Sequence, residues 1–403
     1  MRILIVSINV ASWGGSEELW KELAEKALEE GHEVMVSVFE HQVSNQNLIQ
    51  LVELGALLHQ RPLPSYFKNQ SFFRRALSEL KFRLGTDKVA LDWRRVQAWR
   101  PESVVISSGE TFDHYLNEQS FLISYCRKNH IPHFFISQRN WEWGMDVDQD
   151  FRDSRKRLFE SFEAVFFVSY QNYKMACMQL AGDIHKVRII QNPLKVDSNE
   201  ELLFPKSSTL KMAYVARFQT VIKGQDLFLQ ALSDPDLRQF EFELTFFGSG
   251  PDEVYIRELV SYYALEGKVF FGGHVADMRE IWESHQLLVL CSLAEGTPLS
   301  LIEAMACGRT ALVTQVGDSA IWLSDLGYVA ESNRVEAIQN TLFEALKNSQ
   351  NWEEQGRACK NRIRSHRNPD EVVSLLECIV GERDWSTTGL DPEVFRLKMK
   401  TEN

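Results

Sequence analysis

Apolar runs and amphipathic stretches alternate along the first half of the chain. The run Ile3–Ile8 is followed by a stretch with helical spacing of apolar residues from Leu19 to Leu28, which ends before Gly31. Four more runs predict strands, at Glu33–Phe39, Ser103–Ser107, His133–Ser137 and Val165–Ser169. Continuous apolar runs are typical of parallel strands that are buried on both faces. Their alternation with helices predicts a doubly wound α/β sheet.

The second half repeats this pattern. Strands are predicted at 212–216, 243–247, 269–271, 285–291 and 310–314, and helices at 224–232, 253–264 and 298–307. The polar segment 193–210 is typical of a linker. We therefore expect two Rossmann-like domains, at 1–192 and 211–380, that face each other across a cleft. The tail 381–403 is expected to cross back to the first domain. In such sheets, ligands bind at the carboxyl ends of the strands.

Composition narrows the class of protein. The 403 residues carry a net charge of −12, which disfavours a nucleic-acid binder. The charge is uneven: residues 1–192 hold 23 basic and 24 acidic side chains, against 21 and 32 in residues 193–403. Six cysteines without a Cys-x-x-Cys pair disfavour a disulfide framework or a zinc site. No apolar run approaches the ~20 residues of a membrane helix, and we expect a cytoplasmic protein.

Residues 293–308 contain the most informative motif, with Glu295 and Glu303 eight residues apart. Thr297 suits a helix N-cap and Pro298 the first helical position. The free backbone N–H groups at such a helix start form an anion site suited to phosphate. Glu303 is placed to accept hydrogen bonds from a vicinal diol such as ribose, and Glu295 to face the sugar end of a ligand.

Two further motifs follow predicted strands. Arg217 and Lys223 flank a predicted strand-to-helix loop, where two cations would neutralise a diphosphate. Gly14 and Gly15 form a turn that lets the backbone approach a ligand closely. The dinucleotide fingerprint Gly-x-Gly-x-x-Gly is absent there, which disfavours an NAD site.

The motif at 293–308 resembles the Glu-x7-Glu signature of the retaining glycosyltransferases of family 4, which have the GT-B fold of two Rossmann-like domains. The resemblance implies a donor-side domain at 211–380 and an acceptor-side domain at 1–192. It implies that Glu303 binds the nucleotide ribose and that Glu295 contacts the donor sugar. The remaining donor contacts that it implies are Gly14, Gly15, Arg217, Lys223, Gly250, Val275, Gly296, Thr297, Pro298 and Leu299.

The resemblance implies transfer of a glycosyl group from a nucleoside-diphosphate sugar to an acceptor hydroxyl, with retention of configuration at the anomeric carbon. We expect the group to be a hexosyl group and the product to belong to polysaccharide or glycolipid synthesis. Arg217, Lys223 and Glu295 are the expected catalytic residues, and no metal is expected because the two cations take its role. Two alternatives remain open. One is a sugar-nucleotide 2-epimerase on the same fold, and the other is a non-catalytic binding protein on a degenerate glycosyltransferase fold.

The acceptor side departs from the family pattern. No histidine directly follows the predicted strand at 103–107, so we assign its place in catalysis and acceptor binding to Glu110, with His114 as a weaker candidate. Asn140 and Trp141 are candidates for an acceptor platform, because tryptophan faces stack on sugars. The Asp-x-Asp sequence at Asp146–Asp148 has the form of a metal motif, but an acidic helix cap explains it better.

Residues 68–100 are rich in basic side chains, with nine lysines and arginines against three acids and with aromatic residues between them. A basic amphipathic helix can lie on an anionic membrane, and one interpretation is a peripheral contact at the inner face of the membrane. An ordinary solvated helix whose apolar face covers the sheet is the alternative.

Overall fold

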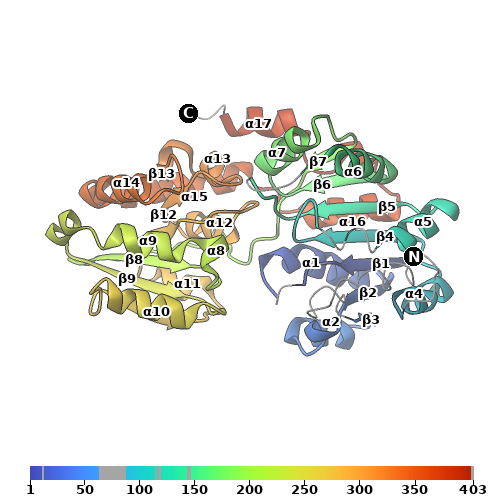
Figure 1. Ribbon diagram of the computed structural model, residues 1–403, viewed down its shortest axis with the longest axis horizontal. Coiled ribbons are helices and arrows are strands. Elements are labelled where there is room, and N and C mark those ends of the chain that lie inside the picture. Colours follow the sequence, from blue (N-terminus) through green and yellow to red (C-terminus); the bar gives the residue numbers. More distant parts are fainter. Residues whose placement is uncertain (11–12, 63–87, 114–115, 117–118, 143–146, 401–403) are drawn as a thin grey trace. The chain divides into compact units, whose positions relative to one another are not determined.

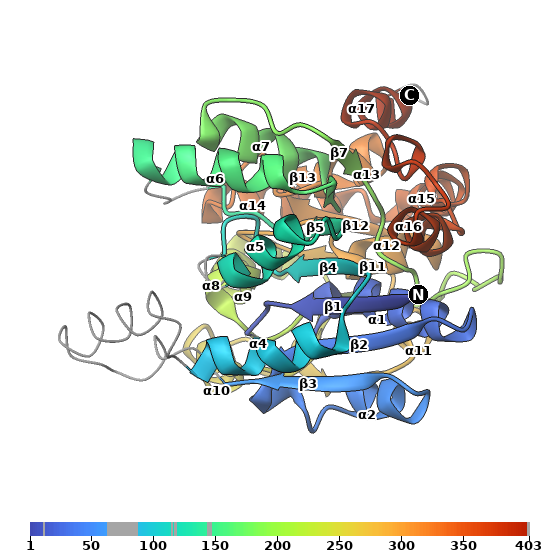
Figure 2. The ribbon, with the colours of Figure 1, turned by 90° about the vertical axis from the view of Figure 1, so that its right-hand side faces the viewer.

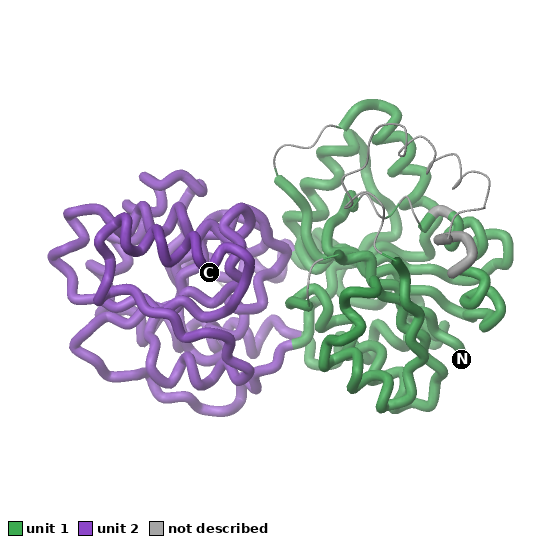
Figure 3. Tube along the Cα trace, turned by 60° about the horizontal axis from the view of Figure 1, so that its bottom comes forward, with its two compact units in different colours: residues 1–193, 368–395 green, residues 194–367, 396–403 purple. Residues whose placement is uncertain are grey.

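The structure is a computed structural model that describes residues 1–10, 13–62, 88–113, 116, 119–142 and 147–400. The chain divides into two compact units (Figure 3). Unit 1 comprises residues 1–193 and 368–395, and unit 2 comprises residues 194–367 and 396–403. Each unit is built on one parallel sheet with helices on it (Figure 1). In the described residues, no helix combines the length and apolar character needed to cross a membrane.

The described part of unit 1 contains a seven-stranded sheet of order β3-β2-β1-β4-β5-β6-β7, of which the strands from β3 to β5 can be followed in Figure 2. Its strands are β1 (Arg2–Ser7), β2 (Glu33–Phe39), β3 (Leu57–Arg61), β4 (Ser103–Ser108), β5 (His133–Ser137), β6 (Ala164–Phe167) and β7 (Val187–Ile189). Its helices are α1 (Gly15–Glu29), α2 (Gln46–Glu53), α4 (Lys88–Trp99), α5 (Ser120–Lys128), α6 (Gln149–Ser161), α7 (Tyr170–Leu180) and α16 (Glu371–Val380), with 3₁₀ turns η1 (Glu40–Gln42) and η7 (Trp385–Thr387).

Unit 2 has a six-stranded sheet of order β10-β9-β8-β11-β12-β13 in its described residues. The strands are β8 (Leu210–Val215), β9 (Phe242–Phe247), β10 (Val269–Gly273), β11 (Leu287–Leu290), β12 (Thr310–Thr314) and β13 (Tyr328–Ala330). The helices are α8 (Thr220–Lys223), α9 (Gln225–Leu232), α10 (Glu253–Tyr262), α11 (Met278–Trp282), α12 (Leu299–Ala306), α13 (Ser319–Leu323), α14 (Val335–Lys347) and α15 (Trp352–His366), with 3₁₀ turns η4 (Pro235–Gln239), η5 (Ser324–Leu326) and η6 (Ser349–Asn351). The boundary between the units falls within α17 (Pro392–Lys400).

The central strands form where the apolar runs predicted them. β1 is buried from Ile3 to Ser7 and pairs with β4, with Ile5 opposite Val105. Against this sheet α1 places the apolar face that its helical spacing predicted, including Leu19 and Trp20. Burial of this kind supplies most of the stability of the unit, because each large apolar side chain that leaves water contributes roughly 1.5–3 kcal/mol.

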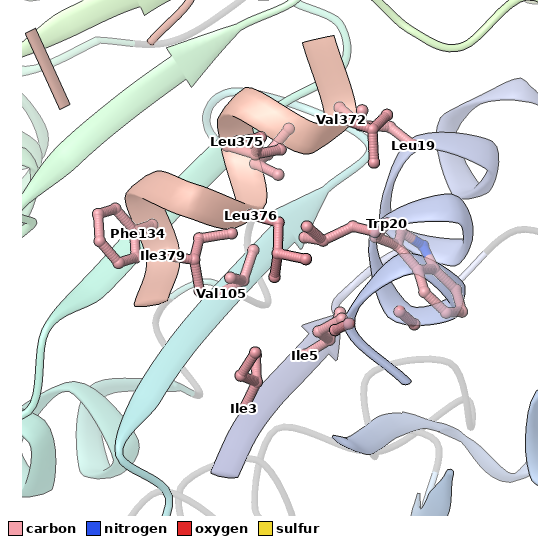
Figure 4. Close-up of a cluster of buried hydrophobic side chains, with 14 of the residues drawn as sticks. Ile3, Ile5, Leu19, Trp20, Val105, Phe134, Val372, Leu375, Leu376 and Ile379 are labelled. Carbon is pink, nitrogen blue, oxygen red and sulfur yellow. The ribbon is translucent and has the colours of Figure 1, made fainter. Parts of the chain in front are cut away.

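Residues 368–395 belong to unit 1, whereas the predicted second domain extended to residue 380. The reason is the apolar face of α16, whose residues Leu375, Leu376 and Ile379 lie in the core with α1, β1 and β4 (Figure 4). After α16 the chain stays on this unit, where Leu390 forms an antiparallel bridge to Ile189. Residues 396–403 then cluster with unit 2.

Three short edge strands, β3, β7 and β13, have no counterpart among the predicted strands. β3 is the clearest case, because its sequence Leu57–Arg61 contains two polar residues that are buried. The His59 ring bonds the Ser37 hydroxyl at 2.8 Å, and the Arg61 guanidinium lies 4.3 Å from the Phe39 ring centre. These partners compensate for the burial of polar groups in a way that an apolar run does not reveal.

Candidate active site

The order of the second sheet fixes where a ligand site is expected. The chain passes from β8 to β9 on one side, while β11 lies on the other side of β8. This is a topological switch point, and in open α/β sheets ligands bind outside the carboxyl ends of the two strands that flank it. The segments that follow β8 and β11 carry Arg217, Lys223 and Glu295, so all three residues lie at the carboxyl edge of the sheet.

Lys223 and Glu295 form an ion pair there. Nζ of Lys223, the last residue of α8, lies 2.5 Å from Oε1 of Glu295, and the Ser292 hydroxyl donates to the same oxygen at 2.7 Å. Side-chain exposure is 22% for Lys223 and 9% for Glu295. A charge-assisted contact with so little water around it is strong and directional. The motif predicts a lysine that faces a diphosphate, and the structure adds a fixed protein counter-ion for its ammonium.

The backbone around this pair is tightly packed. The Leu293 N–H donates to the Ile222 carbonyl at 2.8 Å, which joins the segment after β11 to α8. Gly224 follows α8 with φ of +64°, and a Cβ at this position would lie 2.1 Å from the Cys291 carbonyl oxygen. Only glycine allows this approach. The short turn α8 is thereby held directly against the end of β11.

Arg217 lies in the loop between β8 and α8 and is half-buried. Its carbonyl accepts a hydrogen bond of 2.8 Å from the Gln225 side chain. No ion pair of its guanidinium is found among the residues that the structure describes. The site therefore combines one paired cation and one cation whose charge is available to an anionic ligand.

Helix α12 begins one residue later than predicted. Pro298 has ψ of 118° and stands as the N-cap, where its carbonyl accepts from the Leu301 and Ile302 N–H groups at 3.1 and 3.3 Å. Thr297 consequently lies outside the helix and does not cap it. Proline has no N–H group, so the first helical donors are those of Leu299 and Ser300. The positive end of the helix dipole remains at the predicted place.

Two buried positions complete this part of the site. Glu303 lies on the second turn of α12, with 7% of its surface exposed. Gly296 is held by the loop after β12: its carbonyl accepts the Asp318 N–H at 2.9 Å, and a Cβ on Gly317 would lie 2.1 Å from that carbonyl oxygen. The buried Asp318 thus anchors the loop that carries Glu295.

The other predicted donor residues lie at the same edge of the second sheet. Gly250 belongs to the loop after β9, which bonds the loop after β8 through the Phe218 N–H and the Ser249 carbonyl at 3.0 Å. In the same loop the Asp252 carboxylate accepts from both the N–H and the hydroxyl of Thr220, at 2.7 and 2.9 Å, and so caps α8. Val275 is half-buried in the loop after β10, two strands away from β8.

In unit 1, Gly14 and Gly15 stand at the start of α1. The neighbouring Glu17 is buried, and its carboxyl group accepts from the Gly14 N–H at 2.9 Å, the Asn9 amide at 2.6 Å and the Ser16 hydroxyl at 2.8 Å. Burial outweighs these bonds and raises the pKa of Glu17 to about 7. The sequence motif of two glycines, a serine and a glutamate includes this acid, but it does not indicate that the acid is buried.

Glu110 lies two residues after the end of β4, and its carboxylate is ion-paired. Its Oε1 lies 2.5 Å from the guanidinium of Arg139, which follows β5. The Arg139 guanidinium lies 5.2 Å from the Trp141 ring centre, a cation–π distance. Arg139 is therefore a member of this cluster that the sequence did not indicate, although it directly precedes the predicted Asn140.

Asn140 and Trp141 are held by one side chain of α7. The Asn140 amide donates to the Gln179 side-chain oxygen at 2.8 Å, and the Gln179 amide donates to the Trp141 carbonyl at 2.7 Å. Asn140 is buried and Trp141 is half-buried. Asn140 therefore fixes the loop after β5 against α7, while the Trp141 ring is partly accessible.

Several candidates lie outside the described residues, namely His114, Asp146 and residues 68–87. Asp148 is described and caps α6, since its carboxylate accepts the Phe151 N–H at 2.8 Å. Within the described ranges there is no group of three or more histidine, cysteine, aspartate or glutamate side chains that could hold a metal ion.

The fold and the topology define the class of this protein: two Rossmann-like units with the strand order of nucleotide-binding domains, which is the GT-B architecture. The chain is similar over 94% of its length to 98% of Anabaena HepE, solved in complex with UDP and glucose, with a TM-score of 0.65 and 16% identity. It is similar over 94% of its length to 98% of sucrose-phosphate synthase from Thermosynechococcus elongatus, with a TM-score of 0.68 and 15% identity.

Sequence comparison then relates part of the second unit to a family of enzymes. Residues 209–348 match the family model described as glycosyl transferases group 1. It is also 26% identical over 170 residues to N-acetyl-alpha-D-glucosaminyl L-malate synthase of Bacillus anthracis. That alignment covers 42% of this chain and 44% of the relative, less than half the length of either.

Proposed function

We propose that the protein is a retaining glycosyltransferase that moves a hexosyl group from a nucleoside-diphosphate sugar to an acceptor hydroxyl. The observation that carries this proposal is the Lys223–Glu295 pair, which with Arg217 lies at the switch point of the unit that matches the glycosyltransferase family. A role in polysaccharide or glycolipid synthesis is part of the proposal and rests on the resemblance of the Glu-x7-Glu motif.

In this proposal the second unit binds the donor. The Arg217 guanidinium, the Lys223 ammonium and the N–H groups of Leu299 and Ser300 face the diphosphate. Glu303 accepts hydrogen bonds from the ribose hydroxyls, and Glu295 contacts the sugar while it holds Lys223. The backbone at Gly296, Thr297 and Pro298 lines the diphosphate and sugar, and Gly250 and Val275 lie toward the base. Support comes from the burial of both glutamates and from the N–H groups that open α12.

The proposed reaction breaks the bond between the anomeric carbon and the diphosphate oxygen and forms a bond from the acceptor oxygen to the same carbon, on the same face. The proton of the acceptor hydroxyl passes to the departing phosphate oxygen. Charge accumulates on the diphosphate as it leaves, and fixed cations in a site with little water stabilise that charge most effectively. The counter-ion Glu295 keeps the Lys223 ammonium in place before the charge develops.

No cofactor other than the sugar nucleotide is proposed. Arg217 and Lys223 supply the positive charge that a divalent ion provides in other transferases. We expect EDTA to leave the transfer rate unchanged, and a rate that requires added Mg²⁺ or Mn²⁺ would contradict this part of the proposal.

UDP is the nucleotide that we propose for the donor, because HepE, similar over most of the chain, was solved with UDP. On the acceptor side we propose that Glu110, Asn140 and Trp141 bind the incoming carbohydrate or lipid-linked acceptor, and that Gly14 and Gly15 approach the donor phosphate. The partly accessible Trp141 ring beside the Arg139 guanidinium supports an acceptor that presents a sugar face.

A cytoplasmic location with a peripheral membrane contact through residues 68–100 also stays a proposal. The described part of this segment has Arg94 and Arg95 exposed, while Trp93 and Val96 are buried. The six cysteines of the chain are free, which suits a reducing compartment. Co-sedimentation with anionic vesicles at low salt tests the membrane contact. Protein that remains in the supernatant would contradict this part of the proposal.

The first test is a thermal-shift panel with UDP, GDP, ADP and CMP on the wild type and on Glu303→Ala. A ligand at 100 times its Kd stabilises by about 2.7 kcal/mol, which is easily measured. We expect UDP to raise the Tm of the wild type and to raise that of the variant much less. The absence of a shift with all four nucleotides would contradict donor binding. Product formation from a UDP-sugar only when acceptor is present then separates transfer from epimerisation and from binding alone.

A further inference from the structure

Tyr214 is a buried polar residue near the carboxyl end of a central strand. It belongs to β8, where its neighbours Met212 and Ala213 are also completely buried. Its ring packs against Phe228 and Phe246, with centroids 5.7 and 5.2 Å away. A hydroxyl at such a position costs free energy unless both its donor and its acceptor capacities are used.

Both capacities of the Tyr214 hydroxyl are used by backbone groups of the proposed donor site. The hydroxyl donates to the Lys223 carbonyl and accepts the Cys291 N–H at 3.0 Å. The first partner is the last residue of α8, and the second is the first residue after β11. One oxygen atom therefore joins the two segments whose side chains form the Lys223–Glu295 pair.

The geometry of these segments makes that bridge important. α8 is a single turn of four residues, which has little stability of its own. Its start is capped by Asp252, and its end bonds Tyr214 at the residue that carries the ammonium. Burial raises the pKa of the Tyr214 hydroxyl well above its usual value, so the hydroxyl remains a donor throughout the neutral and alkaline range of enzyme assays.

We propose that Tyr214 is a positioning residue for catalysis, whose hydroxyl sets the separation of the backbone at Lys223 and at Cys291 and so holds the Lys223 ammonium where the leaving diphosphate develops its charge. The inference rests on the proposed function. It adds a residue that does not touch the substrate and that no motif in the sequence indicated. A displacement of the ammonium by a fraction of an ångström would lower transition-state stabilisation more than ground-state binding.

The test is the kinetics of Tyr214→Phe, which removes only the hydroxyl, beside the matched control Thr310→Val. The Thr310 hydroxyl is also buried in unit 2 and donates to a backbone carbonyl, that of Leu326, at 2.6 Å. We expect Tyr214→Phe to lower kcat at least tenfold with little change in the KM for the donor, whereas Thr310→Val keeps kcat within about twofold at a comparable loss of Tm. A kcat loss no larger than that of Thr310→Val would overturn the inference.

A double variant shows whether Tyr214 acts through Lys223. We expect Tyr214→Phe to cause no further loss of kcat in the Lys223→Ala background, because the group that it positions is already absent. Losses that multiply fully would overturn the positioning role. A wild type without transfer activity, or a Lys223→Ala variant as active as the wild type, would overturn the proposed function and this inference with it. Normal transfer by Tyr214→Phe, with Lys223→Ala inactive, overturns the inference alone.

Discussion

The two sheets share one topology and differ in where they place charge. In each, the first three strands run outward on one side of a switch point and the later strands on the other, with orders β3-β2-β1-β4 and β10-β9-β8-β11. In unit 2, the ion pair Lys223–Glu295 joins the segments after the two strands that flank the switch point. In unit 1, the pair Glu110–Arg139 joins the segments after β4 and β5 instead, one strand further along.

The segment after the first strand of unit 1 carries neutral donors around one buried carboxyl group, that of Glu17, where unit 2 carries cations. Neutral donors around a carboxyl group with a pKa of about 7 attract a diphosphate less strongly than two cations do. The comparison shows that the fold supplies two similar edges and that the residues at each edge decide which one suits a negatively charged ligand.

Removal of the Lys223 ammonium should have the largest effect on activity, because it removes a charge that distinguishes the edge of unit 2 from that of unit 1. We expect Lys223→Ala to lower turnover at least about 100-fold, or on the order of 3 kcal/mol, the loss typical for a group that stabilises developing charge. Steady-state kinetics with a saturating UDP-sugar measures it. Lys211→Ala is the control, since Lys211 is paired with Glu243 at 3.4 Å in the same unit. Turnover near that of the wild type in Lys223→Ala would refute the role.

The buried acid of unit 1 predicts a pH dependence of stability. The pKa of Glu17 is raised from 4.5 to about 7, so the native state keeps a proton that the unfolded state has released between these values. Its contribution therefore favours folding below about pH 4.5 and is lost as the pH rises to about 7, by on the order of 3 kcal/mol at most. Denaturant unfolding across this range measures the effect.

Glu17→Gln should abolish the contribution of Glu17 to the pH dependence of stability. The unfolding free energy of the wild type minus that of the variant should therefore change between pH 4.5 and 7. The control is Glu25→Gln, which alters a pair with Lys21 on the same helix and should give a nearly constant difference. A constant difference for Glu17→Gln as well would contradict the raised pKa.

Loss of the Glu110–Arg139 pair of unit 1 should affect the use of the acceptor rather than the binding of the donor. We expect Glu110→Gln to lower kcat/KM for the acceptor about tenfold, because Arg139 and the Trp141 ring lose a fixed partner, on the order of 1.4 kcal/mol. The UDP thermal shift should not change. The exposed pair Arg2–Glu102 provides the control variant Glu102→Gln. A reduced UDP shift in Glu110→Gln would mean that both edges bind the donor.

The smallest effect is expected from the cap of α8. Asp252→Ala removes the acceptor for the Thr220 N–H and should cost about 1 kcal/mol of stability, as other helix caps do, with a loss of turnover of a few-fold. Asp277→Ala removes the cap of α11, where the carboxylate accepts the Arg279 N–H at 2.9 Å, and should cost similar stability without loss of turnover. Equal turnover in the two variants would show that α8 needs no cap to position Lys223.

The central strands and the amphipathic helices could be predicted from the sequence because their apolar patterns are long and regular. The strands His133–Ser137 and Thr310–Thr314 begin and end at the predicted residues. β3 could not be predicted, since its buried His59 and Arg61 depend on partners distant in the sequence. The placement of α16 in unit 1 also could not, because its apolar face fits either sheet as far as a pattern shows.

The site was predictable where a motif is local. Glu295, Glu303 and the helix start lie within nine residues, and their spacing indicates a phosphate-binding helix. Pairings between segments were not predictable: Glu295 is 72 residues from Lys223, and Glu110 is 29 residues from Arg139. Tyr214 gave the weakest signal, since a tyrosine in an apolar strand is ordinary until its hydroxyl partners are known.

The position of α16 has a consequence for the order in which the protein is made. The core around β1 and β4 includes Leu375, Leu376 and Ile379, which leave the ribosome after every strand of the second sheet. Unit 1, most of which is translated first, can therefore complete its core only after α16 has been synthesised. By that stage all strands of the second sheet have already been made. During synthesis the nascent first sheet exposes an apolar face, and this is the stage at which a chaperone would be needed.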